Sequence, residues 1–261
     1  MSKIENKAKI AIIGGGVAGS SAALYFGQLG LNVTLFEKDE SLVSGPPWCH
    51  LHAGGNLYRE ISDTQGVTLL KQSIDFLRFY PFVVDYRPTV IVLPTTDSST
   101  PEALLPRLKL LTNEYKAYIA QDPKNEVLGK PENYYQIYSK EEIKGLRQKE
   151  LVQAPKTSEE WMIPVAKNID MDKVQFPLIM VQEYGLNLFR LSAAAEITLD
   201  SLHSVTLNTN SIVYDVQKNV ETEGWNISYV KEDVSHTDSF DYLINAAGFR
   251  TGKIDDLLGA P

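Results

Sequence analysis

The start of the chain alternates between short apolar runs and a segment of small residues. Residues 9–13 are an apolar run that ends at three consecutive glycines, a pattern that predicts a parallel strand buried on both faces. Residues 17–29 contain good helix formers and are followed by Gly30, which is typical of a helix C-terminus. A second apolar run, residues 32–36, ends at Glu37. The pattern predicts a strand, a helix and a second strand, which together form a βαβ unit.

The middle of the chain has a mixed pattern. Residues 64–80 repeat apolar side chains at helical spacing, and residues 101–120 predict a second helix. Two short runs on either side of Pro88 predict strands, and Ser139 is typical of a helix N-cap. Residues 121–138 carry two prolines, a glycine and three tyrosines, and predict a loop.

Alternating segments return near the end of the chain. Residues 209–216 and 225–230 predict a β-hairpin, and residues 240–248 predict a strand that ends in small residues. The carboxyl end of such a strand faces the cofactor crevice in an open α/β sheet. An ordinary buried strand and turn would give the same local pattern.

The three glycines Gly14, Gly16 and Gly19 have the spacing of a dinucleotide-binding turn. The first allows a tight turn, the second lets a diphosphate approach the backbone, and the third lets the helix pack closely. The helix N-terminus offers free N–H groups and a partial positive charge. Glu37, 18 residues after Gly19, can accept hydrogen bonds from ribose hydroxyls and disfavours the 2′-phosphate of NADP. A structural glycine turn in another kind of α/β protein is the alternative.

Composition and charge exclude several classes of protein. The chain has 261 residues, 43% of them hydrophobic, enough for one large or two modest domains. Its 25 basic and 33 acidic residues give a net charge of −8, which argues against a nucleic-acid partner. The single cysteine, Cys49, excludes an intrachain disulfide and favours a reducing, cytoplasmic location. Residues 10–36 carry no charge, but their glycines and polar residues argue against an integral membrane segment.

The loop after the second strand favours FAD over NAD. Residues 44–56 are rich in small residues and carry two histidines. A nicotinamide dehydrogenase would normally continue into another helix and strand, whereas a long loop of small residues suits a chain that runs along an extended cofactor. A complete NAD dehydrogenase is therefore the less favoured alternative.

These segments resemble the glycine oxidase/D-amino acid oxidase superfamily of FAD-dependent oxidoreductases. The resemblance rests on the glycine turn with its acid, on the His-Ala-Gly-Gly loop, on the Asn-Ala-Ala-Gly strand end, and on residues 183–191, which look like the family's return to a cofactor-domain helix. It implies FAD as cofactor, and the residues it assigns to FAD are Gly14, Gly15, Gly16, Val17, Ala18, Gly19, Glu37, Lys38, His52, Ala53, Gly54, Gly55, Val213, Ala246, Ala247 and Gly248.

The resemblance also implies a fold. The implied fold is an α/β protein with a Rossmann-like FAD-binding domain and an inserted α+β substrate domain. The FAD-binding domain is expected to contain a parallel sheet with helices and a β-hairpin layer. The expected limits are residues 1–80 and 184–261 for the FAD-binding domain and residues 81–183 for the insert. Family members continue well past the Ala-Ala-Gly segment, whereas this chain stops 13 residues after Gly248. We therefore expect a fragment, or a second polypeptide that completes the flavin site.

The chemistry expected from the resemblance is that of the flavin, which takes a hydride from a C–H bond next to an amine or hydroxyl of a small amino or hydroxy acid. No catalytic residue and no metal site are predicted. His52 could carry FAD covalently, as in the dimethylglycine and sarcosine dehydrogenases, contact it noncovalently, or be structural. Cys49 could form a thioether to flavin or fill a small space. Arg59 and Arg190 could anchor a substrate carboxylate, or lie at the surface or cap helices.

Two other functions stay open. One is a quinone-linked hydroxy-acid dehydrogenase resembling malate:quinone oxidoreductases, to which Asn187 near a helix start also points, and which would leave peripheral membrane association open. The other is a non-catalytic or truncated dinucleotide-binding chain. Both keep the nucleotide site and differ in the chemistry beyond it.

Overall fold

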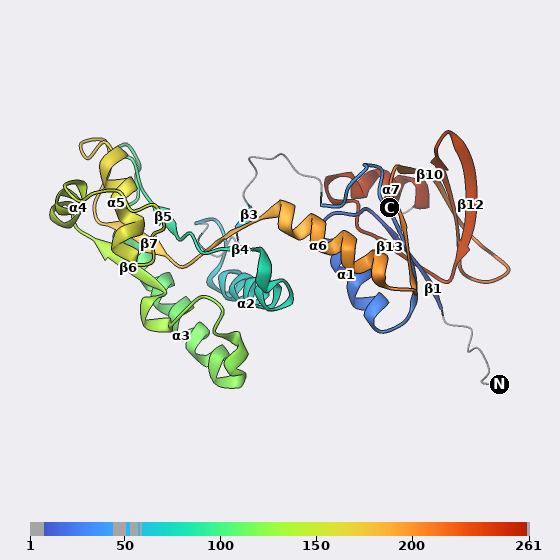
Figure 1. Cartoon of the computed structure of the whole chain (residues 1–261), viewed down its shortest axis with the longest axis horizontal. Coiled ribbons are helices and arrows are strands. Elements are labelled where there is room, and N and C mark those ends of the chain that lie inside the picture. The colour runs from blue at the N-terminus through green and yellow to red at the C-terminus, as the bar shows by residue number, and fades with distance from the viewer. Residues whose placement is uncertain (1–7, 44–50, 53–56, 58, 260–261) are drawn as a thin grey trace. The chain divides into compact units, whose positions relative to one another are not determined.

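The computed structural model describes residues 8–43, 51–52, 57 and 59–259 (Figure 1). Its contacts divide the chain into two compact units. Unit 1 consists of Met1–Cys49 with Leu188–Pro261, and unit 2 is His50–Asn187. The first unit is therefore discontinuous in sequence and the second is an insertion into it.

Unit 1 is built around a four-stranded parallel sheet with the order β13-β1-β2-β9. Its strands are β1 (Lys9–Ile13), β2 (Asn32–Phe36), β9 (Val205–Asn208) and β13 (Tyr242–Asn245). The helices α1 (Val17–Gln28) and α6 (Leu188–Ser201) pack against each other, and α1 also packs on β1 and β2. The predicted βαβ unit at the start of the chain is confirmed.

A second, antiparallel layer covers the parallel sheet. It consists of β10 (Ser211–Lys218), β11 (Trp225–Lys231) and β12 (Val234–Phe240), and α7 (Thr251–Leu258) contacts β10 and β13. Ala11 and Ile13, which share one face of β1, join side chains of this layer and of α7 in one buried core; its other members are Phe36, Val216, Ile227, Tyr229, Phe240 and Ile254. The predicted parallel sheet with helices and a hairpin layer is confirmed.

In its described residues, unit 2 combines two small antiparallel sheets with four α-helices. One sheet has the order β3-β8-β4 and the other β5-β7-β6. The strands are β3 (Leu51–His52), β4 (Val84–Asp85), β5 (Thr89–Ile91), β6 (Tyr135–Tyr138), β7 (Leu178–Val181) and β8 (Gly185–Leu186). The helices are α2 (Asp63–Phe79), α3 (Leu105–Gln121), α4 (Lys140–Arg147) and α5 (Ser158–Asn168). Short 3₁₀ turns span Pro81–Val83, Pro101–Leu104, Pro123–Asn125 and Pro131–Asn133, and another in unit 1 spans Gly248–Arg250.

The start of α2 and the start of α4 show why local sequence determines them. Ser62 and Ser139 accept hydrogen bonds from the third backbone N–H of their helices, and Gln65 and Glu142 bond back to the N-cap N–H. Such capping boxes satisfy donors that a helix end leaves unpaired. The predicted N-cap at Ser139 is therefore confirmed.

The division into units differs from the predicted limits at β3 and α2, because unit 2 begins at His50. The sequence places residues up to 80 in the FAD-binding domain, whereas α2 packs against α3 and falls in unit 2. The second limit, between residues 183 and 184, lies close to the observed return to unit 1 at Leu188. α2 falls in unit 2 because it packs against α3, which is the next α-helix along the chain.

Candidate functional site

The turn between β1 and α1 needs glycine at its first position. Gly14 has a φ of +107° and donates its N–H to the carbonyl of Phe36 at 2.8 Å. A Cβ atom at Gly14 would lie 2.4 Å from the carbonyl oxygen of Ala246, which is closer than real Cβ contacts allow. The turn is therefore tight, and the end of β13 lies directly against it.

Gly16 and Gly19 differ sharply in what surrounds them. A Cβ atom at Gly19 would lie 1.8 Å from the carbonyl oxygen of Gly14, so α1 begins directly over the turn. A Cβ atom at Gly16 would meet nothing within 4 Å, and the φ of Gly16 is −66°, which any residue adopts. The chain itself therefore requires glycine at Gly19 but not at Gly16.

The first turn of α1 can receive an anion. Gly16 is its N-cap and makes no side-chain capping bond, and the first turn contains no acidic residue. A helix leaves its first backbone N–H groups without intrahelical acceptors, and here these include the N–H groups of Val17 and Ala18. The open surface at Gly16 lets a phosphate come close to them.

Glu37 connects the end of β2 to the glycine turn. Its carboxylate accepts the N–H of Gly15 at 2.7 Å through Oε2 and the N–H of Asp39 at 2.9 Å through Oε1. The side chain is 7% exposed, and a Cβ atom at Gly15 would lie only 2.9 Å from the Cβ of Glu37. Each carboxylate oxygen has more than one lone pair, so the fixed carboxylate can still accept a ligand hydroxyl.

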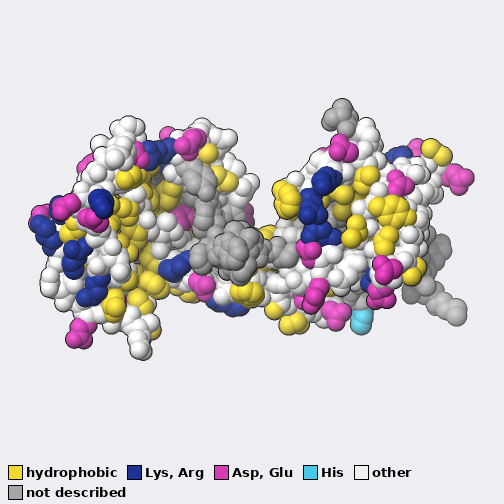
Figure 2. Space-filling model, turned by 90° about the horizontal axis from the view of Figure 1, so that it is seen from above, with side chains coloured by type: hydrophobic (Ala, Val, Ile, Leu, Met, Phe, Trp, Pro, Cys, Tyr) yellow, Lys and Arg dark blue, Asp and Glu magenta, His cyan; other side chains and the backbone are white. Residues whose placement is uncertain are grey.

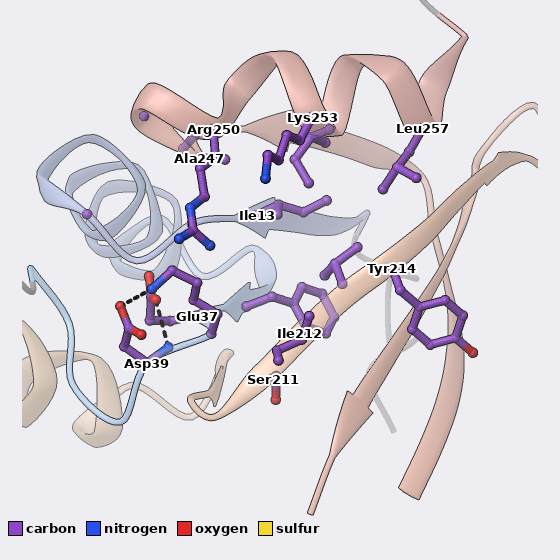
Figure 3. Close-up of a pocket in the computed structure, with 18 of the residues that line it drawn as sticks. Ile13, Glu37, Asp39, Ser211, Ile212, Tyr214, Ala247, Arg250, Lys253 and Leu257 are labelled. Atoms are coloured by element: carbon purple, nitrogen blue, oxygen red, sulfur yellow. Dashed lines mark hydrogen bonds and ion pairs between the residues drawn. The ribbon is translucent and has the colours of Figure 1, made fainter. Parts of the chain in front are cut away.

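A pocket of about 560 Å³ lies over this turn (Figure 3). It is bounded by the ends of β1 and β2, by β10, by the Ala-Ala-Gly segment after β13, and by α7. Eight of the residues predicted to bind the cofactor line it: Gly14, Gly16, Glu37, Lys38, Val213, Ala246, Ala247 and Gly248. The structure thus brings together three segments that lie far apart in the sequence.

The pocket also has lining residues that the sequence interpretation missed. Apolar side chains from β10 and α7 form part of its wall, and Figure 3 shows Ile212 and Leu257 among them. Arg250 and Lys253 line it from the 3₁₀ turn and from α7. The available signal was their position directly after the Ala-Ala-Gly segment, because a chain leaving that strand end must pass the crevice.

Other predicted site residues lie elsewhere. Gly15, Val17, Ala18 and Gly19 belong to the turn and to α1 and do not line the pocket. The backbone of His52 pairs with Gly185 in unit 2. Ala53, Gly54 and Gly55 lie outside the described residues, as does Cys49. Their proposed roles stay predictions.

The two arginines proposed as substrate anchors do not line this pocket. Arg59 donates two hydrogen bonds to Asp97, at 2.9 and 2.6 Å, and one to Ser99. The hydrogen bond from Arg59 lowers the pKa of Asp97 to about 2 and raises the pKa of Arg59 itself. Arg190 is exposed in the first turn of α6. Arg59 is thus engaged within unit 2, and its role toward a substrate stays a prediction.

The described residues contain no group of three or more His, Cys, Asp or Glu side chains placed to hold a metal ion. Within the same residues, every helix is too short or too polar to cross a membrane.

Comparison with known proteins gives one family. Residues 9–132 match the family described as FAD dependent oxidoreductase. No curated protein sequence matches the chain.

The solved structures with a similar fold include three oxidoreductases. L-proline dehydrogenase from P. horikoshii matches with a TM-score of 0.61 and 16% identity, over 98% of this chain and 57% of that one. Glycine oxidase from Geobacillus kaustophilus matches with a TM-score of 0.53 and 16% identity, over 97% of this chain and 59% of that one. L-alpha-glycerophosphate oxidase from Mycoplasma pneumoniae, solved with FAD bound, matches with a TM-score of 0.52 and 17% identity, over 98% of this chain and 58% of that one. The chain thus spans less than three-fifths of each, and the likeness confirms the predicted fold.

Proposed function

We propose that the pocket of unit 1 binds FAD, because residues 9–132 match the family described as FAD dependent oxidoreductase. We propose further that the protein oxidises a C–H bond next to an amine or hydroxyl of a small substrate such as an amino or hydroxy acid. When bound, FAD supplies the hydride acceptor for this reaction.

The observation that carries the proposal is that Gly16 and Glu37 line the same pocket. Gly16 has space around it that the fold does not use, while the carboxylate of Glu37 is held in place by two backbone N–H groups. An open backbone at a helix N-terminus fits a diphosphate, and a fixed carboxylate fits ribose hydroxyls. A dinucleotide uses both features, whereas the packing of the turn makes no use of the open space at Gly16.

The rest of the pocket fits the same ligand. The small residues Ala246, Ala247 and Gly248 leave room for a ligand against the backbone. Val213 on β10 is our proposed adenine contact, and its neighbour Ile212 adds apolar surface on the same wall. The proposed contacts of the chain are therefore backbone N–H groups to the diphosphate, a carboxylate to the ribose and an apolar wall to the base.

Unit 2 is our proposed substrate domain, with its core between residues 81 and 183. The named substrates of the similar structures support a small substrate: proline and glycine carry an amine, and glycerophosphate carries a hydroxyl. Because these relatives are much longer than the chain, we include in the proposal that a longer or second polypeptide completes the flavin site. The single cysteine supports a cytoplasmic location.

The test is a titration of the purified, cofactor-free chain with FAD, in which flavin fluorescence and calorimetry measure the binding. We expect saturable binding of FAD and an absorbance band near roughly 450 nm, the property of an oxidised flavin. Acid precipitation then separates free from covalent flavin and tests the alternatives for His52. Failure to bind FAD, combined with tight binding of NADH, would refute the proposal.

A further inference from the structure

Two basic side chains face the pocket from α7 and the turn before it. Arg250 ends the 3₁₀ turn Gly248–Arg250, and Lys253 lies in the first turn of α7. Both line the pocket and both are exposed. In Figure 3 they extend from the helix into the space across from Glu37. Within the described residues neither forms an ion pair; Arg250 lies only over the ring of Phe249, with 5.3 Å from its Cζ to the ring centroid.

The acidic residues of the same pocket already have partners. Glu37 accepts two backbone N–H groups, and Asp39 pairs with Lys38. On α7 itself, the carboxylate of Asp255 accepts a hydrogen bond from Asn245, and neither it nor Asp256 lines the pocket. The unbalanced charge of the pocket is therefore positive, although the whole chain has a net charge of −8. A site with this charge favours an anionic ligand.

The backbone places the start of the segment that carries these cations against the glycine turn. The carbonyl oxygen of Ala246 lies 2.4 Å from the position that a Cβ atom would take at Gly14. The Cβ of Ala246 lies 3.3 Å from the position that a Cβ atom would take at Gly19. The N–H of Arg250 donates to the carbonyl of Ala247 at 3.0 Å. The segment that carries both cations thus starts against the same turn that receives a diphosphate.

We propose that Arg250 and Lys253 bind the diphosphate of the cofactor, opposite the glycine turn. The proposal rests on the FAD site proposed above and adds two charged residues to it. Guanidinium and ammonium groups form charge-assisted hydrogen bonds with phosphate oxygens. Gly16 gives the phosphate access to backbone N–H groups, and α7 supplies positive charge from the other side. The two residues select a ligand for its phosphates and not for its base.

The experiment compares ligands with and without phosphate on the cofactor-free full chain. The variants are Arg250→Gln, Lys253→Gln and the double variant. Calorimetry measures the binding of FAD, ADP and adenosine to each of them. Lys218→Gln is the matched control, because Lys218 is an exposed lysine of β10 that does not line the pocket. Thermal unfolding verifies that each variant folds, as expected for exposed side chains without ion pairs.

We expect each single substitution to raise the dissociation constants of FAD and ADP roughly fivefold, as for a partly exposed charge-assisted contact. Adenosine binding and the control should stay unchanged, and the double variant should show a weaker salt dependence. Unchanged FAD and ADP affinity in the double variant would overturn this inference and leave the FAD site in place. An equal loss for adenosine would also overturn it, because the residues would then act on the base. If the wild type binds neither FAD nor ADP, the FAD site fails and the inference fails with it.

Discussion

The contrast between Gly16 and Gly19 separates a ligand contact from a packing requirement. Replacing Gly16 by Ala places a methyl group where no protein atom lies within 4 Å. The backbone there has a φ of −66°, so the change adds no strain. Loss of a favourable N-cap residue and lower entropy of the unfolded chain act in opposite directions. We expect the free energy of unfolding to stay within about 1 kcal/mol of the wild type.

The same substitution at Gly19 has a different outcome. A methyl group there would lie 1.8 Å from the carbonyl oxygen of Gly14, so α1 has to move off the turn. Overpacking of this kind costs about 2–3 kcal/mol, which lowers the melting temperature by roughly 5–10 °C. Gly145→Ala is the control for a harmless methyl group, because Gly145 is exposed in α4 with nothing within 4 Å. It should raise stability by about 0.5–1 kcal/mol.

The assay pairs urea unfolding with FAD titration of each variant. Gly16→Ala should keep its stability and lose at least about tenfold in FAD affinity, or about 1.4 kcal/mol, because the methyl group occupies the space of the diphosphate. Gly145→Ala should bind FAD like the wild type. The reasoning is refuted if Gly16→Ala binds FAD normally, or if it unfolds as easily as Gly19→Ala.

Three further predictions follow from hydrogen bonds described by the structure. Glu37→Gln replaces one acceptor oxygen by an amide NH₂ that faces the N–H of Gly15 or Asp39, so we expect a loss of about 1–3 kcal/mol in urea unfolding; a loss below the error of the measurement would contradict it. Tyr134→Phe removes a buried 2.7 Å hydrogen bond to Glu183 and should lower the unfolding free energy by about 1–2 kcal/mol. The matched control is Tyr135→Phe, at a partly buried position on β6. The pKa of Asp97 is lowered from 3.8 to about 2, so its stabilising contribution is complete above pH 3.8 and is lost as the pH falls toward 2. Asp97→Asn should remove that part of the acid dependence, and an unchanged acid unfolding curve would contradict the ion pair with Arg59.

The sequence predicted elements whose signals are local. The glycine spacing and the apolar runs on either side of it predicted β1, α1 and β2, and Ser139 marked the start of α4. In these cases, the residues that determine the element lie within a few positions of it. The position of Glu37 after β2 was likewise local information, since it follows directly from the end of that strand.

Other elements depend on partners far along the chain. Residues 121–138 have the composition of a loop, yet β6 forms there because Tyr135 pairs with Val181 on β7. No helix was predicted at α5, which contains Pro164, although Thr157 and Glu160 form a capping box at its start. Strand pairing of this kind leaves no periodic signal in the segment itself, whereas the capping box of α5 is a local signal that the sequence interpretation missed.

The candidate site was predicted in the same uneven way. The glycine turn and the Ala-Ala-Gly segment were recognisable motifs, and the structure brings them to one pocket. Arg250 and Lys253 look like ordinary surface charges in the sequence, because only the fold shows that they line the same pocket as Gly14 and Gly16. The hydrogen bond from Gly15 to Glu37 also joins residues whose contact is set by the packing of β1 beside β2.

The order of strands in the parallel sheet has a consequence for folding during synthesis on the ribosome. β1 and β2 are synthesised first, but their outer neighbours β13 and β9 come from the far side of the insertion. Unit 2 is continuous and can form while the early strands still lack those neighbours. Unpaired strand edges attract other chains, so a nascent chain halted before β9 exposes the outer edges of β1 and β2 to association with other chains. Chaperones that bind extended apolar segments would find β1 and β2 exposed during that interval.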